Sequence, residues 1–211
     1  MTRAAAPRME PLPIAEWADE ERELLRGNMA RADRYLTGAA DAPPVPSILG
    51  LFARHPRLSA PWLAFSGTLL DDGTLDPRDR EMLILRVGHR TGCRYQWAQH
   101  VGMARAAGLE PGQIAALRED VEAGSWSERD RDILRAADQL VDGHTIDDAL
   151  WERLAGRFDE RRLLELLFVV GAYVCLAMVL NSVGLEPAAG PAADAVPDPA
   201  PATGPSGTSA Q

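Results

Sequence analysis

The sequence contains no lysine, so all 22 of its basic residues are arginines. A Schiff-base enzyme needs a lysine amine, and a P-loop nucleotide site needs a lysine beside the phosphates. The absence of lysine therefore excludes Schiff-base enzymes, internal aldimines of pyridoxal phosphate and P-loop NTPases. The sequence also lacks a glycine-rich phosphate loop and a Gly-x-Ser-x-Gly nucleophile elbow.

Cysteine is scarce, and basic charge is outweighed by acidic charge. The two cysteines, Cys93 and Cys175, are too few for a disulfide framework or a cysteine-rich zinc site, and no residues have zinc-ligand spacing. The formal net charge is −9, without a basic cluster, which argues against binding to nucleic acid or to an anionic membrane. No basic segment followed by an apolar run opens the chain, so the sequence predicts a cytoplasmic protein.

The 211 residues are 46% hydrophobic, which is enough for the core of one domain. The composition predicts three parts. Residues 1–10 are expected to be flexible, residues 11–185 to form a helical domain, and the Pro/Ala/Gly-rich residues 186–211 to be a disordered tail.

Apolar residues recur at helical spacing, and no alternating strand pattern of useful length is present. Caps and breakers set the expected helix ends: Asp76-Pro77 begins one helix, and Gly108 ends the next. The sequence therefore predicts an all-α fold, with helices at 47–54, 56–70, 78–90, 93–107, 111–119, after Ser127, at 147–157 and at 159–183.

The last predicted helix is apolar nearly all the way round. Its apolar run, Leu166 to Leu180, is shorter than the roughly 18 residues of a membrane span. Helices of this kind are buried in a core or between subunits, and a small domain has little room to surround one completely. The sequence therefore predicts a homo-oligomer that does not span a membrane.

Chemically capable residues concentrate between Glu81 and His100. On the predicted helix 93–107, Cys93, Gln96, Trp97 and His100 lie at i, i+3, i+4 and i+7, and so share one face. Cys93 falls in the first turn, where a helix N-terminus favours a thiolate. Glu81 lies among apolar residues, and a buried carboxylate needs a partner. His100 and Cys93 are the expected partners.

Each of these residues also has a purely structural interpretation. A glutamate on such a helix can pair with Arg78 or Arg90 instead. A single histidine is often a hydrogen-bonded structural residue, and a single cysteine is usually a small buried hydrophobe. Cys175, inside the apolar helix, fits that last description.

The order of the residues resembles the carboxymuconolactone decarboxylase family, which includes the alkyl hydroperoxidase D-like proteins. The resemblance rests on Leu-Asp-Pro-Arg-Asp-Arg-Glu-Met-Leu-Ile-Leu-Arg at 75–86, Gly-Cys-Arg-Tyr-Gln-Trp-Ala-Gln-His at 92–100 and Ala-Ala-Gly-Leu at 106–109. Shorter matches, such as Arg-His-Pro at 54–56 and Leu-Asn-Ser-Val-Gly at 180–184, extend it to about residues 10–186 and to the longer, single-domain members.

The resemblance implies an all-α, alkyl hydroperoxidase D-like domain that assembles as a trimer or hexamer, with no metal and no organic cofactor. Glu81, Cys93 and His100 match the glutamate, first cysteine and histidine of the hydroperoxidase motif, whereas Gln96 replaces the second cysteine. A dithiol cycle needs a resolving thiol, which Gln96 cannot supply. In the decarboxylase branch this position tends to carry an acid, and glutamine cannot take up a proton.

Three functions follow from these residues. The first is a cofactor-free enzyme that decarboxylates, isomerises or dehydrates a small cyclic or unsaturated organic acid or lactone. There, His100 is the general acid/base, Glu81 tunes it, and Gln96 and Arg94 hold a carbonyl or carboxylate. The second is a single-cysteine thiol peroxidase that uses Cys93. The third is a non-catalytic oligomeric binding protein. The expected pocket walls are Tyr95, Trp97, Trp62 and Phe65.

Overall fold

The protein is described by a computed structural model that covers residues 6–37 and 43–188. Within these residues the chain forms one short 3-10 helix and ten α-helices and no strand, which confirms the predicted all-α class. The elements are η1 (Ile14–Glu16), α1 (Asp19–Leu25), α2 (Ala30–Asp33), α3 (Ser47–Phe52), α4 (Pro56–Leu70), α5 (Pro77–Arg90), α6 (Arg94–Ala106), α7 (Pro111–Ala116), α8 (Glu128–Gly143), α9 (Asp148–Ala155) and α10 (Glu160–Val183).

Side-chain caps explain where several of these helices begin. The Asp76 carboxylate accepts the N–H of Arg78, and Pro77 occupies the first position of α5. Ser127, Asp147 and Asp159 cap α8, α9 and α10 in the same way. Such caps satisfy backbone N–H groups that have no partner inside the helix. The predicted starts of these helices therefore agree with the structure to within about one residue.

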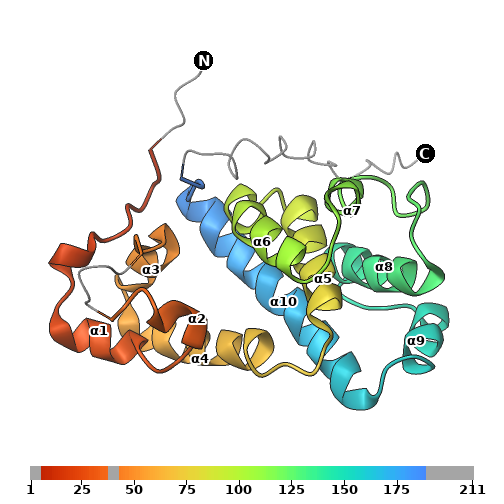
Figure 1. The fold of residues 1–211 in the computed structure, drawn as a ribbon, viewed down its shortest axis with the longest axis horizontal. Helices are drawn as coiled ribbons and strands as arrows, with labels where there is room; N and C mark the ends of the chain where they lie inside the picture. Colours follow the sequence, from red (N-terminus) through yellow and green to blue (C-terminus); the bar gives the residue numbers. More distant parts are fainter. Residues whose placement is uncertain (1–5, 38–42, 189–211) are drawn as a thin grey trace, which may run out of the picture.

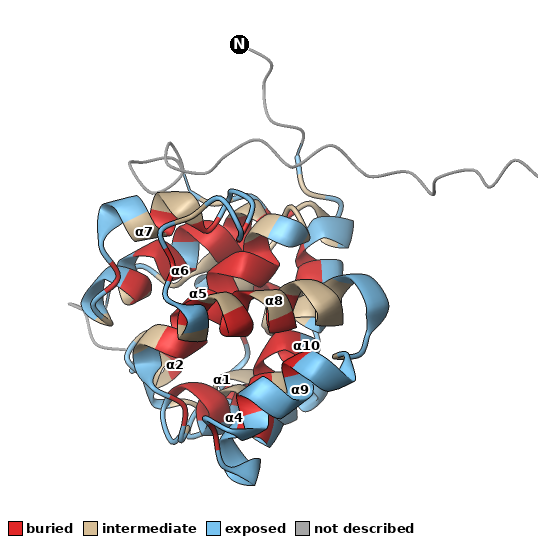
Figure 2. Ribbon diagram, turned by 90° about the vertical axis from the view of Figure 1, so that its right-hand side faces the viewer, coloured by how far each residue is buried: buried red, intermediate tan, exposed pale blue. Residues whose placement is uncertain are grey.

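Helix α5 lies at the centre of the larger helical group, against α6, α8 and α10. Residues 79–88 are all buried, including the four charged residues among them. Figure 2 shows α5 as a continuous buried segment surrounded by partly exposed helices. Every charged side chain on this stretch consequently needs a partner of opposite charge or a hydrogen bond.

Helix α10 crosses the molecule between the two groups of helices seen in Figure 1, α1–α4 on one side and α5–α9 on the other. It packs against α4, α5, α8 and α9. By length and composition α10 could cross a membrane, but 44% of its most apolar window is buried inside the protein. The core helix of a globular domain passes the same test.

Ion pairs with a constant spacing join α5 to α8. In each pair the two residues are 52 positions apart, and both numbers increase along the chain, so the two helices run parallel. The pair in the middle is the most buried, because its arginine, Arg86, is only 4% exposed. The pairs are Arg78–Asp130, Arg86–Asp138 and Arg90–Asp142.

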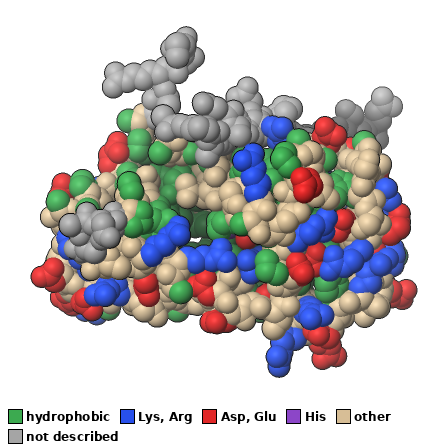
Figure 3. Space-filling model, viewed as in Figure 1, with side chains coloured by type: hydrophobic (Ala, Val, Ile, Leu, Met, Phe, Trp, Pro, Cys, Tyr) green, Lys and Arg blue, Asp and Glu red, His purple; other side chains and the backbone are tan. Residues whose placement is uncertain are grey.

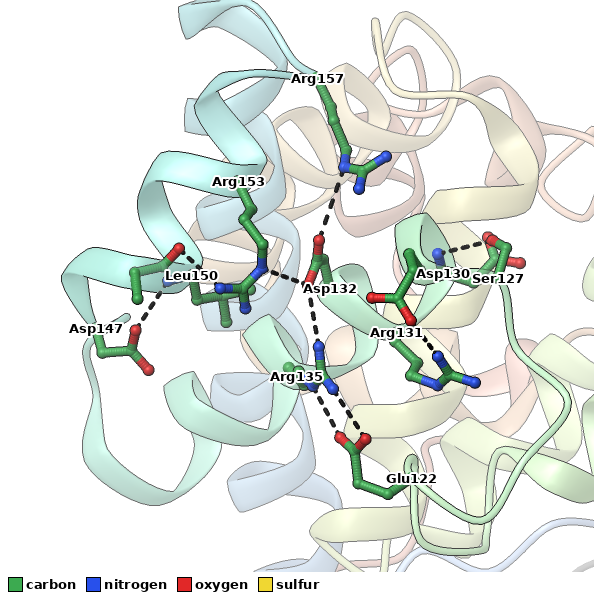
Figure 4. A network of polar contacts seen from close by, with 12 residues as sticks. Glu122, Ser127, Asp130, Arg131, Asp132, Arg135, Asp147, Leu150, Arg153 and Arg157 are labelled. Carbon is green, nitrogen blue, oxygen red and sulfur yellow. Dashed lines mark hydrogen bonds and ion pairs between the residues drawn. The ribbon is translucent and has the colours of Figure 1, made fainter.

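A second charged cluster ties α8 to α9 and to the turn after it (Figure 4). Asp132 is fully buried and lies 2.9 Å from Arg153, 3.2 Å from Arg135 and 3.7 Å from Arg157. The three arginines offset the cost of burying this carboxylate. None of these four residues lines the cavity described below.

The N-terminal elements η1, α1 and α2 were not predicted, because they are short and their apolar residues are few. The expected boundary at residue 11 also falls inside a packed segment, since the N–H of Arg8 donates to the carbonyl of Val183 at 2.6 Å. Glu186 likewise pairs with Arg94. The rest of the expected flexible N-terminus (1–5) and tail (189–211) lies outside the described residues.

Replacing Arg86 by methionine should lower the free energy of unfolding by about 3–5 kcal/mol, because the partly buried Asp138 carboxylate and the carbonyls of Leu117 and Glu119 lose their donor. Arg90→Met is the matched control. Its pair with Asp142 is more exposed, so we expect a loss of less than about 1 kcal/mol. Urea unfolding of both variants checks this, and equal losses would contradict it.

The predicted trimer or hexamer stays a prediction, and α10 is where we expect the copies to meet. Its outer side exposes Leu164, Phe168, Met178 and Val179. Placing glutamate at both Leu164 and Met178 should lower the mass measured by light scattering, because the new charges would be buried at the contact. Leu58→Glu on α4, also at an exposed leucine, is the control and should leave the mass unchanged.

Candidate functional site

Glu81 and His100 form a buried hydrogen-bonded pair between α5 and α6. The Glu81 Oε2 and His100 Nδ1 atoms lie 2.7 Å apart. Glu81 is 1% exposed and His100 is 6% exposed. The contact that the sequence led us to expect between these two residues is therefore present, although they are 19 positions apart.

The electrostatic surroundings keep Glu81 ionised. Burial alone would raise the pKa of Glu81, but the charge and hydrogen bond of His100, with the charges of Arg80 and Arg31, outweigh burial and hold it below its usual value. Arg80 Nε lies 3.5 Å from the other carboxylate oxygen, Oε1. An ionised Glu81 can only accept a hydrogen bond, so His100 carries its proton on Nδ1. The Nε2 atom of a neutral His100 is then free to act as a base.

His100 lines a cavity of about 240 Å³ between the N-terminal helices and α6 and α10. The walls are mainly apolar and aromatic. Figure 3 shows a hollow on this face, with hydrophobic side chains inside and basic side chains near its edge. The aromatic residues of the lining are Tyr35, Phe52, Trp62, Tyr95 and Tyr173.

Two arginines from α2 and its C-terminal end also line the cavity. Arg31 is held in place, because it donates to the Asp71 carboxylate at 3.0 Å and to the Leu70 carbonyl at 3.1 Å. Arg34 lies 4.5 Å from the centre of the Tyr35 ring and donates to the Tyr35 hydroxyl. In the described part of the chain, no carboxylate pairs with Arg34. Arg34 is therefore the cationic group of the cavity that is best able to receive an anion.

Two of the expected binding residues on α6, Gln96 and Tyr95, line the cavity. The Gln96 amide nitrogen donates to the Ile84 carbonyl at 3.1 Å, which fixes the side chain against α5. The Tyr95 hydroxyl accepts the N–H of Ile48 at 3.2 Å, which ties α6 to α3. Trp62 is also part of the lining, whereas Phe65, the other expected wall residue from α4, is not.

Of the expected common face of Cys93, Gln96, Trp97 and His100, only Gln96 and His100 reach the cavity, so the expectation that Cys93 and Trp97 line it is wrong. Cys93 is the N-cap of α6 rather than part of its first turn. Its side chain packs in an apolar cluster with Leu51 and Leu180, and it is not among the residues that line the cavity.

The expected thiolate is also wrong. Burial raises the pKa of the Cys93 thiol to about 11, and this outweighs the opposing hydrogen bond from the Gln96 backbone. The rise from the ordinary value of 9.0 corresponds to about 3 kcal/mol in favour of the thiol. A helix terminus typically contributes less than about 1 kcal/mol.

Trp97 and Arg94 are likewise absent from the cavity lining. Trp97 packs into the core cluster that contains Met82 and Leu117. Arg94 pairs with Glu186 beyond the end of α10, at 3.1 Å. Arg31 and Arg34 occupy the place at the cavity that the sequence analysis gave to Arg94.

Sequence reasoning missed Arg31, Arg34 and Tyr173. The two arginines are on a four-residue helix with too little periodicity to be predicted. Tyr173 lies inside an apolar run, where a tyrosine looks like a core residue. A polar tip within such a run is the only signal that could have pointed to it. Across residues 6–37 and 43–188, no group of three or more potential ligands is placed to hold a metal ion.

Solved structures with the same arrangement of helices define the fold as that of the alkyl hydroperoxidase D core. One is a peroxidase-related protein from Ralstonia eutropha JMP134, with a TM-score of 0.72, 19% identity, and coverage of 88% of this chain and 94% of that one. A peroxidase-related protein from Silicibacter sp. TM1040 has a TM-score of 0.70 and 21% identity, over 90% of this chain and 96% of that one. A protein of unknown function from Agrobacterium tumefaciens has a TM-score of 0.60 and 17% identity, over 66% of this chain and 97% of that one.

A family model matches part of the chain. Residues 56–139 match the model of the carboxymuconolactone decarboxylase family, so this segment is similar to that family. The segment contains Glu81, Cys93, Gln96 and His100 but neither α2 nor α10. No curated protein matches the chain.

The Cys93 thiol should react slowly with iodoacetamide at neutral pH, because it is buried and its pKa is raised to about 11. Its labelling rate should still be rising between about pH 8 and about pH 10 as the thiolate fraction grows. Peptide mass spectrometry on a Cys175→Ser variant isolates this thiol, and the urea-unfolded chain gives the reference rate. Native labelling as fast as in the unfolded chain would contradict the prediction.

Proposed function

We propose that the protein is a cofactor-free enzyme that uses His100 as a general acid/base on a small cyclic or unsaturated organic acid or lactone. The observation that carries this proposal is the Glu81–His100 pair on the wall of an apolar cavity. A histidine whose Nδ1 is held by a carboxylate has Nε2 available for proton transfer.

The cavity walls support a substrate with an apolar carbon skeleton. Aromatic and aliphatic side chains provide most of the lining. Such walls exclude water, and electrostatic interactions are stronger where water is absent. A carboxylate on the substrate would pair with Arg34, whose guanidinium pairs with no carboxylate within the described residues. The substrate would thus be bound by its charge at α2 while a carbon atom approaches His100.

The same proton transfer serves decarboxylation, isomerisation and dehydration. In decarboxylation, the bond to the departing CO2 leaves its electron pair on the substrate, where a conjugated carbonyl delocalises it. The protonated His100 then gives its proton to that carbon and returns to the neutral form. In isomerisation, neutral His100 removes a proton at one carbon and returns it at another.

The proposal is tested by hydrogen exchange, because proton transfer at carbon places solvent deuterium in the product or recovered substrate. A panel of unsaturated lactones and keto acids is incubated with the protein in D2O and followed by NMR. We expect turnover that falls about 100- to 10,000-fold in His100→Gln, as for loss of a general acid/base, with a smaller loss in Glu81→Gln. Cys93→Ser is the control that should retain turnover, and unchanged turnover in His100→Gln would overturn the proposal.

A thiol peroxidase is the second candidate, favoured by the names of the structural neighbours. Two of them are called peroxidase-related, and the name of the third refers to antioxidant defence. In this chain the reaction would depend on Cys93, which is buried and has a raised pKa, and Gln96 supplies no resolving thiol. Rapid oxidation of Cys93 by low peroxide concentrations would favour this function over the first.

A further inference from the structure

Tyr173 places a phenol beside His100 on the cavity wall. It comes from α10, and its ring meets the His100 imidazole edge to face, with centroids 5.0 Å apart and planes at 86°. Both side chains line the cavity. The proposed base and a hydroxyl group are therefore neighbours on one wall, although they come from different helices.

The Tyr173 hydroxyl has no protein partner within the described part of the chain. The other tyrosines of the cavity differ in this respect. The Tyr95 hydroxyl accepts the Ile48 N–H, and the Tyr35 hydroxyl accepts a hydrogen bond from Arg34. A buried tyrosine hydroxyl usually finds a partner, so a group inside the cavity is expected to fill this role.

This hydroxyl remains protonated across the working pH range. Burial raises the pKa of Tyr173 far above its ordinary value, and the nearby charge of Glu81 raises it further. A phenol in this state donates a hydrogen bond and does not take up a proton from the substrate. Its action therefore differs from that of His100.

We propose that Tyr173 is a catalytic residue that donates a hydrogen bond to a carbonyl oxygen of the substrate while His100 moves a proton at the adjacent carbon. The inference rests on the proposed function and narrows the substrate to carbonyl compounds with an acidic C–H next to the carbonyl. When His100 Nε2 removes that proton, the C–H electron pair forms the enolate double bond, and the carbonyl π pair moves onto oxygen. Tyr173 stabilises that oxyanion, and the proton held by His100 then returns to carbon.

4-Nitrophenol tests this step without a known substrate, because its phenolate carries a delocalised negative charge on oxygen, as an enolate does. Its ionisation is visible in the absorption spectrum. At a pH just below the pKa of the free phenol, we expect saturable binding in which the bound ligand is largely phenolate. Tyr173→Phe should weaken phenolate binding about 10-fold or more, the effect of losing a hydrogen bond to a charged group.

A control ligand separates the hydroxyl from the shape of the cavity. The neutral ligand 4-nitroanisole cannot form an oxyanion, so Tyr173→Phe should alter its affinity much less. Because the Tyr173 hydroxyl has no protein partner, the urea midpoint of Tyr173→Phe should match that of the wild type, and this measurement verifies that the variant is folded.

Unchanged phenolate affinity in Tyr173→Phe would overturn the inference, as would the absence of saturable phenolate binding to the wild type. These results are distinguishable from failure of the proposed function. One possible result is deuterium exchange at carbon that depends on His100, with phenolate binding that does not change in Tyr173→Phe. This result would contradict only the role of Tyr173. The opposite result is phenolate binding that depends on Tyr173, with no deuterium exchange at carbon in any compound of the panel. This result would support Tyr173 as a hydrogen-bond donor to an oxyanion and contradict the proposed acid/base function.

Discussion

The burial of α5 on every side is the constraint from which the rest of the structure follows. Ten consecutive residues of this helix are buried, and Asp79, Arg80, Glu81 and Arg86 are among them. A buried charge costs several kcal/mol unless it is paired and hydrogen-bonded. Each of these charged side chains therefore needs a partner, and for Asp79, Glu81 and Arg86 a neighbouring helix supplies it. Arg129 meets Asp79 and Asp138 meets Arg86 on the α8 side.

The same constraint explains why the Glu81–His100 pair is well positioned. Glu81 faces away from α8 and toward α6, where His100 is the group that satisfies it. Arg80 reaches the second carboxylate oxygen from within α5 itself. A residue fixed by its need for a partner is held in one geometry, which is what proton transfer requires. The contact that burial of Glu81 requires is thus also the one on which the proposed proton transfer depends.

The cavity arises because the N-terminal helices and α10 are not packed closely against α6 throughout. The Glu81–His100 pair lies within residues 56–139, the segment that matches the family model. Arg31 and Arg34, from α2 and its C-terminal end, and Tyr173, from α10, line the cavity from outside that segment. In this arrangement His100 is part of the segment matched by the family model, and the cationic and phenolic groups of the cavity come from the flanks.

Features of the fold and the site could be predicted from the sequence where they depend on residues close together in the chain. Caps at Asp76, Ser127 and Asp159 and helical periodicity are local, so the all-α fold and most helix starts could be inferred from the sequence. The Glu81–His100 contact was expected because a buried carboxylate needs a partner and few were available. The surroundings of each side of α6 were not, because residue spacing alone does not say which neighbouring helices those sides meet.

Cys93 shows why these surroundings decide the chemistry. Its place at the start of α6 favours a thiolate, and in an exposed position that effect could have produced a reactive cysteine. Here Leu51, Leu180 and Leu185 surround the sulfur, and the cost of burying a negative charge is larger than the benefit of the helix terminus. The side chain that matches a redox motif therefore acts as a small apolar residue. What remains in contact with the cavity is a base held by a carboxylate and a phenol able to donate a hydrogen bond, and these groups suit the movement of protons rather than the oxidation of sulfur.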